Sequence, residues 1–101
     1  MANEYRVIFS ERAVAQLEKI NQYLLEFFGE TTVDRAIDAF LALIQRLRRQ
    51  PDMYAYYDKK RGLRRALLRS RMWVIYKIEH QTVTITAVYS TYQNIASEDL
   101  T

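Results

Sequence analysis

Two long stretches of the sequence place their apolar residues at the three- and four-residue spacing of an amphipathic helix. The first follows Ser10, whose hydroxyl can cap a helix, and runs to Gly29, a residue type that commonly ends one. The second would be capped by Thr31 or Thr32 and ends before Pro51. Neither stretch is apolar all round, so each helix must bury one side against another part of the chain. We therefore expect an antiparallel helix hairpin that lies on a sheet.

The segments on either side of the helices have patterns typical of β-strands. Tyr5 to Phe9 is a short run of strand formers, and alternate residues in it would share a face. Later in the chain, three runs separated by short polar turns predict consecutive antiparallel strands: Leu63 to Arg69, Met72 to Ile78 and Thr82 to Tyr89.

The last of these strands shows the clearest alternation. One face is expected to carry Val83, Ile85, Ala87 and Tyr89, and the other Thr82, Thr84 and Thr86. Residues 79–81 are the expected hairpin loop before it. Residues 52–62 contain three tyrosines but no clear period, and we interpret them as a loop.

The order of strand, helix, helix and three strands predicts an α+β fold. An N-terminal strand and a two-helix antiparallel hairpin would pack on a mainly antiparallel sheet that three C-terminal strands complete. The first strand must join this sheet, because an isolated strand leaves its backbone groups unpaired, but the pattern does not identify its neighbour. Residues 1–101 are interpreted as a single domain, since this length suits one core and no linker or repeat interrupts it.

Charge is distributed unevenly along the chain. Residues 46–77 carry 11 basic and 2 acidic side chains, a net charge of +9, whereas residues 1–45 and residues 78–101 each carry −3. Such a block favours an anionic partner, either nucleic acid or an acidic protein segment. Arg46, Arg48 and Arg49 fall at the end of a predicted helix, where positive charge complements the helix dipole. The functional part of the block is therefore expected between Lys59 and Arg71.

Composition excludes several classes of site. The chain has no cysteine and one histidine, His80, which rules out disulfides and leaves too few ligands for a metal site. Its two glycines lie far apart, so no Gly-rich phosphate loop exists, and we expect no cofactor. The sequence has neither an apolar run of about 18 residues nor a basic start followed by an apolar stretch. A cytoplasmic protein with no membrane contact is expected.

The candidate functional residues are basic and phenolic side chains, because no nucleophile with a base and no carboxylate pair is convincing. His80 is expected in an exposed loop. Arginine can hold phosphate or carboxylate through two parallel hydrogen bonds, and tyrosine can stack on bases. The candidate set is Lys59, Lys60, Arg61, Arg64, Arg65, Arg69, Arg71, Tyr89 and Tyr92. Arg64 and Arg65 would point to opposite faces of their strand, so some of these arginines must reach solvent or a partner.

Several short motifs, taken in order, resemble the RelE/ParE superfamily of bacterial type II toxins. They cover nearly the whole chain, and their order and spacing are more specific than any one of them. The motifs are Tyr5–Ser10 followed by Ala13, Leu17, Ile20 and Tyr23-Leu24; Leu47–Pro51; Gly62–Arg65 followed by Val74–Ile78; and Ile85–Asn94.

The long uninterrupted helical hairpin from Ser10 to Gln50 is more similar to the ParE branch of this superfamily. That resemblance implies a toxin that binds and inhibits DNA gyrase, and so an inhibitory binding protein more than an enzyme. It also implies a cognate antitoxin, whose acidic segment would lie over the helices and sheet and engage the basic stretch.

Two alternatives stay open. In RelE-like, ribosome-dependent messenger-RNA endoribonucleases, many members carry a histidine near the end of the last strand and an arginine just after it, where this chain has Tyr89 and Tyr92. An endoribonuclease of this kind would use Arg64 or Arg65 to stabilise charge on the phosphate, and Tyr89 or Tyr92 to transfer a proton. The second alternative is a degenerate, non-toxic member that retains only antitoxin binding.

Overall fold

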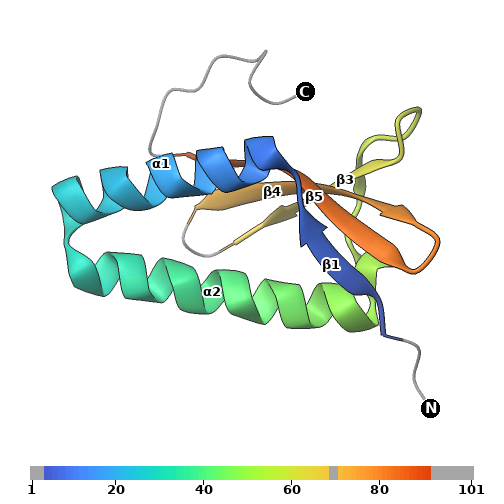
Figure 1. Cartoon of the computed structure of the whole chain (residues 1–101), viewed down its shortest axis with the longest axis horizontal. Helices are drawn as coiled ribbons and strands as arrows, with labels where there is room; N and C mark the ends of the chain where they lie inside the picture. The colour runs from blue at the N-terminus through green and yellow to red at the C-terminus, as the bar shows by residue number, and fades with distance from the viewer. Residues whose placement is uncertain (1–3, 69–70, 92–101) are drawn as a thin grey trace.

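Two helices lie across one face of a five-stranded sheet (Figure 1). The structure is a computed structural model and describes residues 4–68 and 71–91. The elements in chain order are β1 (Arg6–Phe9), α1 (Glu11–Phe28), α2 (Glu30–Arg49), a 3-10 turn (Pro51–Met53), β2 (Tyr56–Asp58), β3 (Leu63–Leu67), β4 (Met72–Glu79) and β5 (Thr82–Ser90). The predicted α+β class and helix hairpin are confirmed. No helix in the described part of the chain is long and apolar enough to cross a membrane.

The strands follow the order β1-β5-β4-β3-β2 across the sheet. β1 pairs in parallel with β5, from Arg6 opposite Thr82 to Phe9 opposite Ile85, and the other neighbours are antiparallel. A parallel pair needs a long connection, which the helix hairpin and the three intervening strands supply. Residues 56–58 form a strand, contrary to the interpretation of residues 52–62 as a loop. β2 is too short, and its pairing with β3 too irregular, to produce a readable period.

A single residue, Gly29, joins the two helices. Its φ of +90° suits glycine, and its N–H donates to the carbonyl oxygen of Leu24 at 3.1 Å, which ends α1 as expected. α2 begins directly afterwards at Glu30, so the expectation that Thr31 or Thr32 caps it is wrong. The turn at Gly29 is completed within one residue and leaves no linker in which a threonine cap could sit.

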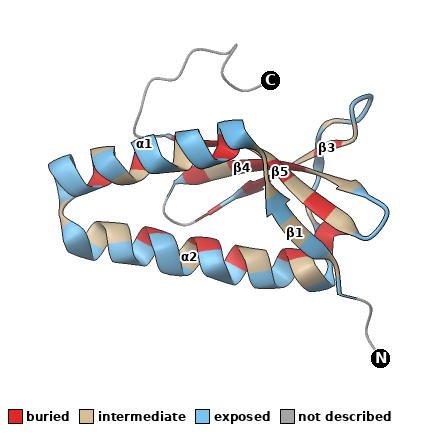
Figure 2. Ribbon diagram, viewed as in Figure 1, coloured by how far each residue is buried: buried red, intermediate tan, exposed pale blue. Residues whose placement is uncertain are grey.

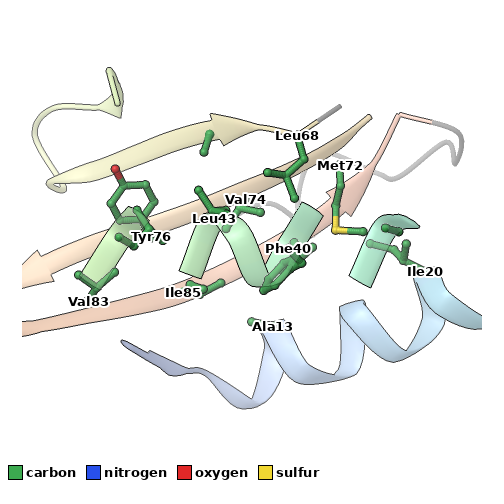
Figure 3. Packing of buried hydrophobic residues seen from close by; sticks show 14 of the residues in the cluster. Ala13, Ile20, Phe40, Leu43, Leu68, Met72, Val74, Tyr76, Val83 and Ile85 are labelled. Atoms are coloured by element: carbon green, nitrogen blue, oxygen red, sulfur yellow. The ribbon is translucent and has the colours of Figure 1, made fainter. Parts of the chain in front are cut away.

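The main core lies between the helices and the sheet (Figure 3). Figure 2 shows that the buried residues of α1 and α2 follow the helix sides turned toward the sheet, while the outer sides are exposed. Phe9 of β1 stacks on Phe40 of α2 with ring centroids 5.8 Å apart. Leu43 and Leu47 are fully buried, and burial of each such side chain contributes about 1.5–3 kcal/mol. This core fixes which sheet face is covered and which is open.

A β-bulge changes the direction of the side chains along β5. Ile75 pairs with Ala87 but the next residue, Tyr76, pairs with Ile85, so Thr86 is an extra residue in β5. Val83 and Ile85 therefore face the helices, whereas Ala87 and Tyr89 join a second cluster with Leu63 and Ile75 on the open face. The expectation that Val83, Ile85, Ala87 and Tyr89 share one face is wrong beyond the bulge, because an inserted residue reverses the alternation.

Candidate partner-binding site on the open sheet face

Four side chains from four neighbouring strands gather on the open face of the sheet. The guanidinium carbon of Arg65 lies 4.3 Å from the ring centroid of Trp73 and 5.5 Å from that of Tyr57. Trp73 in turn stacks on Tyr89, with centroids 6.4 Å apart and planes inclined by 26°. We call Tyr57, Arg65, Trp73 and Tyr89 the Arg65 cluster.

The register of the sheet builds the Arg65 cluster. Trp73 lies opposite Tyr89 of β5 on one side and opposite Leu67 of β3 on the other. In the next row, Arg65 lies opposite Ile75, and Ile75 lies opposite Ala87. Ile75 and Ala87 are almost fully buried, so they form an apolar floor beside the rings. Leu67 is 53% exposed at the margin and extends this surface.

The Arg65 guanidinium is positioned, but no ion pair within residues 4–68 and 71–91 neutralises it. The ion pairs of the described residues join Arg48 to Glu4, Arg61 to Asp58 and Lys77 to Glu79. Arg65 belongs to none of these three pairs. Cation–π contact with two rings holds the side chain on the sheet. A positioned arginine loses less conformational entropy when it binds, so this charge is suited to a carboxylate or phosphate of a partner.

Tyr89 supplies a hydroxyl beside this charge. Desolvation by burial raises the pKa of Tyr89 above its usual value, and the neighbouring Arg65 guanidinium acts in the opposite direction without cancelling the effect. The phenol therefore stays protonated at neutral pH and is a poor base. With one cation, three aromatic rings and no carboxylate or imidazole, the Arg65 cluster is better suited to recognition than to acid–base catalysis.

Arg64 points to the other face and has a structural role. Its Nη1 donates to the carbonyl oxygens of Tyr54, at 2.6 Å, and Asp52, at 3.1 Å. Its guanidinium carbon lies 4.1 Å from the Tyr56 ring centroid. Arg64 thus ties the segment after α2 to the sheet, and the structure separates it from the Arg65 cluster.

The remaining predicted residues lie away from the Arg65 cluster or outside the described chain. Lys59, Lys60 and Arg61 are exposed in the turn between β2 and β3, at the opposite end of the molecule from the tip of the helix hairpin (Figure 1). Arg61 pairs with Asp58 across 3.5 Å. Arg71 is exposed just before β4 with a φ of +60°. Arg69 and Tyr92 lie outside the described residues. His80 occupies the exposed two-residue turn between β4 and β5, as expected.

Trp73 and Tyr57 are not among the functional residues that the sequence predicts. Trp73 lies in a correctly predicted strand, where neighbouring side chains point to opposite faces. Val74 faces the helices, so the alternation along this strand could have indicated that Trp73 faces the open side. Tyr57 could not be assigned to a face of the sheet, because residues 52–62 show no strand-like alternation of apolar and polar residues. Arg65 and Tyr89 were both predicted, but the pattern did not favour them over the other basic and phenolic residues.

Comparisons with known proteins agree with this fold. Residues 7–95 match the family model described as the ParE toxin of the type II toxin-antitoxin system, parDE. A solved structure described as the chromosomal ParDE TA system from P. aeruginosa is similar, with a TM-score of 0.72 and 12% sequence identity. The match covers 88% of this chain and 98% of that chain, and at this identity it shows the fold alone. No curated protein matches the sequence.

Proposed function

This chain belongs to the ParE toxin family of type II toxin–antitoxin systems, and we propose that it acts by binding and inhibiting DNA gyrase until a cognate antitoxin neutralises it. The resemblance to the RelE/ParE superfamily, with the ParE branch favoured, is confirmed by the family match. The observation that supports a binding mechanism is the Arg65 cluster. It offers a positioned cation and aromatic surface without an acid–base pair.

The antitoxin would place an acidic segment on the open sheet face. A carboxylate of that segment can accept two parallel hydrogen bonds from Arg65, and apolar side chains beside it can cover Leu67 and Trp73. Lys59 and Lys60 lie at the end of the same hairpin and raise the local positive potential. A hydrogen bond to a charged group contributes about 1.5–3 kcal/mol, enough for roughly 10- to 100-fold in affinity.

Gyrase would use the same surface, so the antitoxin would neutralise the toxin by competition. This proposal places the action in the cytoplasm, where gyrase works. Two partners that need one cluster cannot occupy it together, because each would have to contact the Arg65 guanidinium. A single substitution at Arg65 should therefore weaken both interactions.

A supercoiling assay with purified protein tests this proposal. Wild-type toxin should inhibit gyrase supercoiling, and the antitoxin encoded in the neighbouring reading frame should restore it. Arg65→Gln should require about 10-fold more toxin for the same inhibition. Arg61→Gln removes the same charge from an exposed arginine outside the cluster and should behave as the wild type. A toxin that leaves supercoiling untouched while it stops translation would show that gyrase is the wrong target.

Messenger-RNA cleavage is a second candidate, favoured by one observation. Arg65 and Tyr89 share the open face of the sheet. The Arg65 guanidinium could stabilise negative charge on a phosphate, and the protonated Tyr89 phenol beside it could donate a proton. Arg64 points to the other face of the sheet, where it donates to the carbonyl oxygen of Tyr54, so we propose Arg65 for this role. Intact messenger RNA after induction of the toxin would exclude cleavage. Unimpaired growth without antitoxin would instead support the non-toxic alternative.

A further inference from the structure

Charges of opposite sign lie at the two ends of the molecule. Residues 18–38, around the junction of α1 and α2, carry five acidic and two basic side chains, a net charge of −3. Figure 1 shows the C-terminal end of α2, the start of β1, and the β4–β5 and β2–β3 turns at the other end. Basic side chains outnumber acidic ones in these four segments. The molecule therefore has an acidic pole and a basic pole.

Hydrogen bonds and strand register link the four segments of the basic pole. The backbone N–H of Tyr5 donates to the carbonyl oxygen of Arg48 at 2.8 Å, which joins β1 to the end of α2. The N–H of Arg6 donates to the carbonyl oxygen of Gln81 at 2.8 Å, which joins β1 to the β4–β5 turn. Lys77 lies opposite the first residue of β3, so the end of β4 adjoins the β2–β3 turn. We define the basic band as residues 4–6, 48–49, 58–61 and 77–81.

Four cations of the basic band are not neutralised. Each carboxylate of the band is paired with a basic side chain of the band, and the three pairs are Glu4–Arg48, Asp58–Arg61 and Glu79–Lys77. Asp52 lies outside the band beside Arg64, which donates to its carbonyl oxygen. The cations that belong to no ion pair of the described residues are all exposed: Arg6, Arg49, Lys59 and Lys60.

The β2–β3 turn fixes the position of two of these cations. Asp58 Oδ1 accepts a hydrogen bond of 3.3 Å from the N–H of Arg61, and the N–H of Gly62 donates to the carbonyl oxygen of Lys59 at 3.1 Å. Gly62 has a φ of +70°, which suits glycine. The turn is thus closed by its own hydrogen bonds, and it presents the adjacent charges of Lys59 and Lys60 to solvent. Their mutual repulsion would be relieved by an anionic partner.

The surface of the basic band is suited to a phosphate backbone. None of the large apolar side chains that are exposed in the described residues belongs to the band, so an apolar partner would gain little there. Next to the β2–β3 turn, the rings of Tyr56 and Tyr57 already contact the guanidinium groups of Arg64 and Arg65, at 4.1 and 5.5 Å. Recognition of a single strand needs rings that can stack on bases. A duplex instead offers one phosphate charge per about 1.7 Å of its axis and needs only cations.

We propose that the basic band binds the phosphate backbone of duplex DNA without regard to base sequence. Lysine and arginine contacts with phosphates position a protein on a duplex but do not read its bases. The same duplex would repel the acidic pole, so the junction of α1 and α2 would point away from the DNA. The Arg65 cluster lies outside the basic band. DNA binding is therefore a further activity, which does not depend on the gyrase inhibition proposed above.

Fluorescence anisotropy with the purified toxin and a labelled duplex of about 30 base pairs tests this proposal. The dissociation constant is measured as salt is raised from about 50 mM, where binding should be detectable. A plot of log K against log salt should have a slope of about −3.6, because each of four neutralised phosphates contributes about 0.9. Absence of binding at the lowest salt concentration would overturn the proposal.

Matched double variants locate the binding surface. Lys59→Gln combined with Lys60→Gln removes two cations of the basic band and should reduce the slope to about −1.8. Lys19→Gln combined with Arg35→Gln removes the same charge from exposed positions at the acidic pole and should leave the slope unchanged. Equal slopes for the two double variants would show that the basic band is not the DNA site.

The choice of nucleic acid identifies the partner. Two duplexes of unrelated sequence should bind with affinities within about 2-fold of each other. A preference of about 10-fold for one duplex, or tighter binding of RNA of the same sequence, would overturn the proposal. Arg65→Gln should keep the wild-type salt slope while it weakens gyrase inhibition, so the two proposals can fail separately.

Discussion

The hydroxyl of Ser10 donates a hydrogen bond of 3.0 Å to the carbonyl oxygen of Thr86, 76 residues further along the chain. The Ser10 Oγ also accepts a hydrogen bond of 3.0 Å from the N–H of Ala13 and so caps α1. Thr86 is the extra residue of the bulge that turns Tyr89 toward the open face. One side chain therefore stabilises both the start of a helix and the irregularity that forms the Arg65 cluster.

Ser10→Ala should lower the free energy of unfolding by about 1–3 kcal/mol, because it removes a helix cap and leaves the Thr86 carbonyl without this donor. Urea denaturation followed by circular dichroism measures the change. Ser10→Thr keeps the hydroxyl and is the control, with an expected loss below about 1 kcal/mol. Equal stability of Ser10→Ala and the wild type would contradict this role of the cap.

The neighbouring arginines Arg64 and Arg65 should give opposite results. Arg64→Gln should lower the free energy of unfolding by about 1–3 kcal/mol, because Tyr54 and Asp52 lose a charged donor. Arg65→Gln should leave stability within about 0.5 kcal/mol of the wild type and weaken antitoxin binding instead. Thermal unfolding and isothermal titration calorimetry on both variants separate the two effects. The reverse pattern would exclude the Arg65 cluster as the binding site.

Trp73 should matter for binding through its contact with Arg65. Trp73→Leu removes the ring beneath the guanidinium and should weaken antitoxin binding about 5- to 10-fold, since a cation–π contact contributes about 0.5–2 kcal/mol. Trp73→Phe keeps an aromatic ring and should lose less. Surface plasmon resonance with immobilised antitoxin gives both dissociation constants. If the leucine variant bound as well as the phenylalanine variant, ring stacking would have no part in recognition.

Stability at alkaline pH should depend on Tyr76. Burial raises the pKa of Tyr76 well above its usual range, and its hydroxyl donates to the carbonyl oxygen of Pro51. The folded state keeps this proton at a pH where the unfolded state releases it, so stability falls as pH rises through about 10. Tyr76→Phe cannot ionise, and its stability should fall less steeply between about pH 9 and pH 11. Parallel pH profiles for the two proteins would refute this assignment.

Much of the fold was predictable because local periodicity determines it. The apolar stripes of α1 and α2 and the alternation at the start of β5 are signals within one element, and these predictions were confirmed. The pairing of β1 with β5 was not predictable, because it joins residues far apart in sequence. The bulge at Thr86 was hidden for a different reason: the residues on both sides of it alternate as in a regular strand.

The candidate site was predicted only in part. Arg64 and Arg65 are adjacent and chemically identical, and their roles differ because the helices cover one face of β3. Which face of β3 the helices cover depends on packing between elements that are distant in sequence. The pattern of residues along β3 carries no information about that packing. Trp73 became recognisable only when its strand was placed beside Arg65 and Tyr89. The predictions for Arg69 and Tyr92 fall outside the described residues.

The parallel pairing of β1 with β5 also sets when the sheet can be completed during synthesis of the chain. Ribosomes add about 5–20 residues per second, so the 76 residues between Ser10 and Thr86 take roughly 4–15 s to make. Until β5 has left the ribosome, β1 has no strand to pair with and Tyr89 is missing from the open face. The nascent chain therefore cannot complete its sheet or the Arg65 cluster until its last strand has been made.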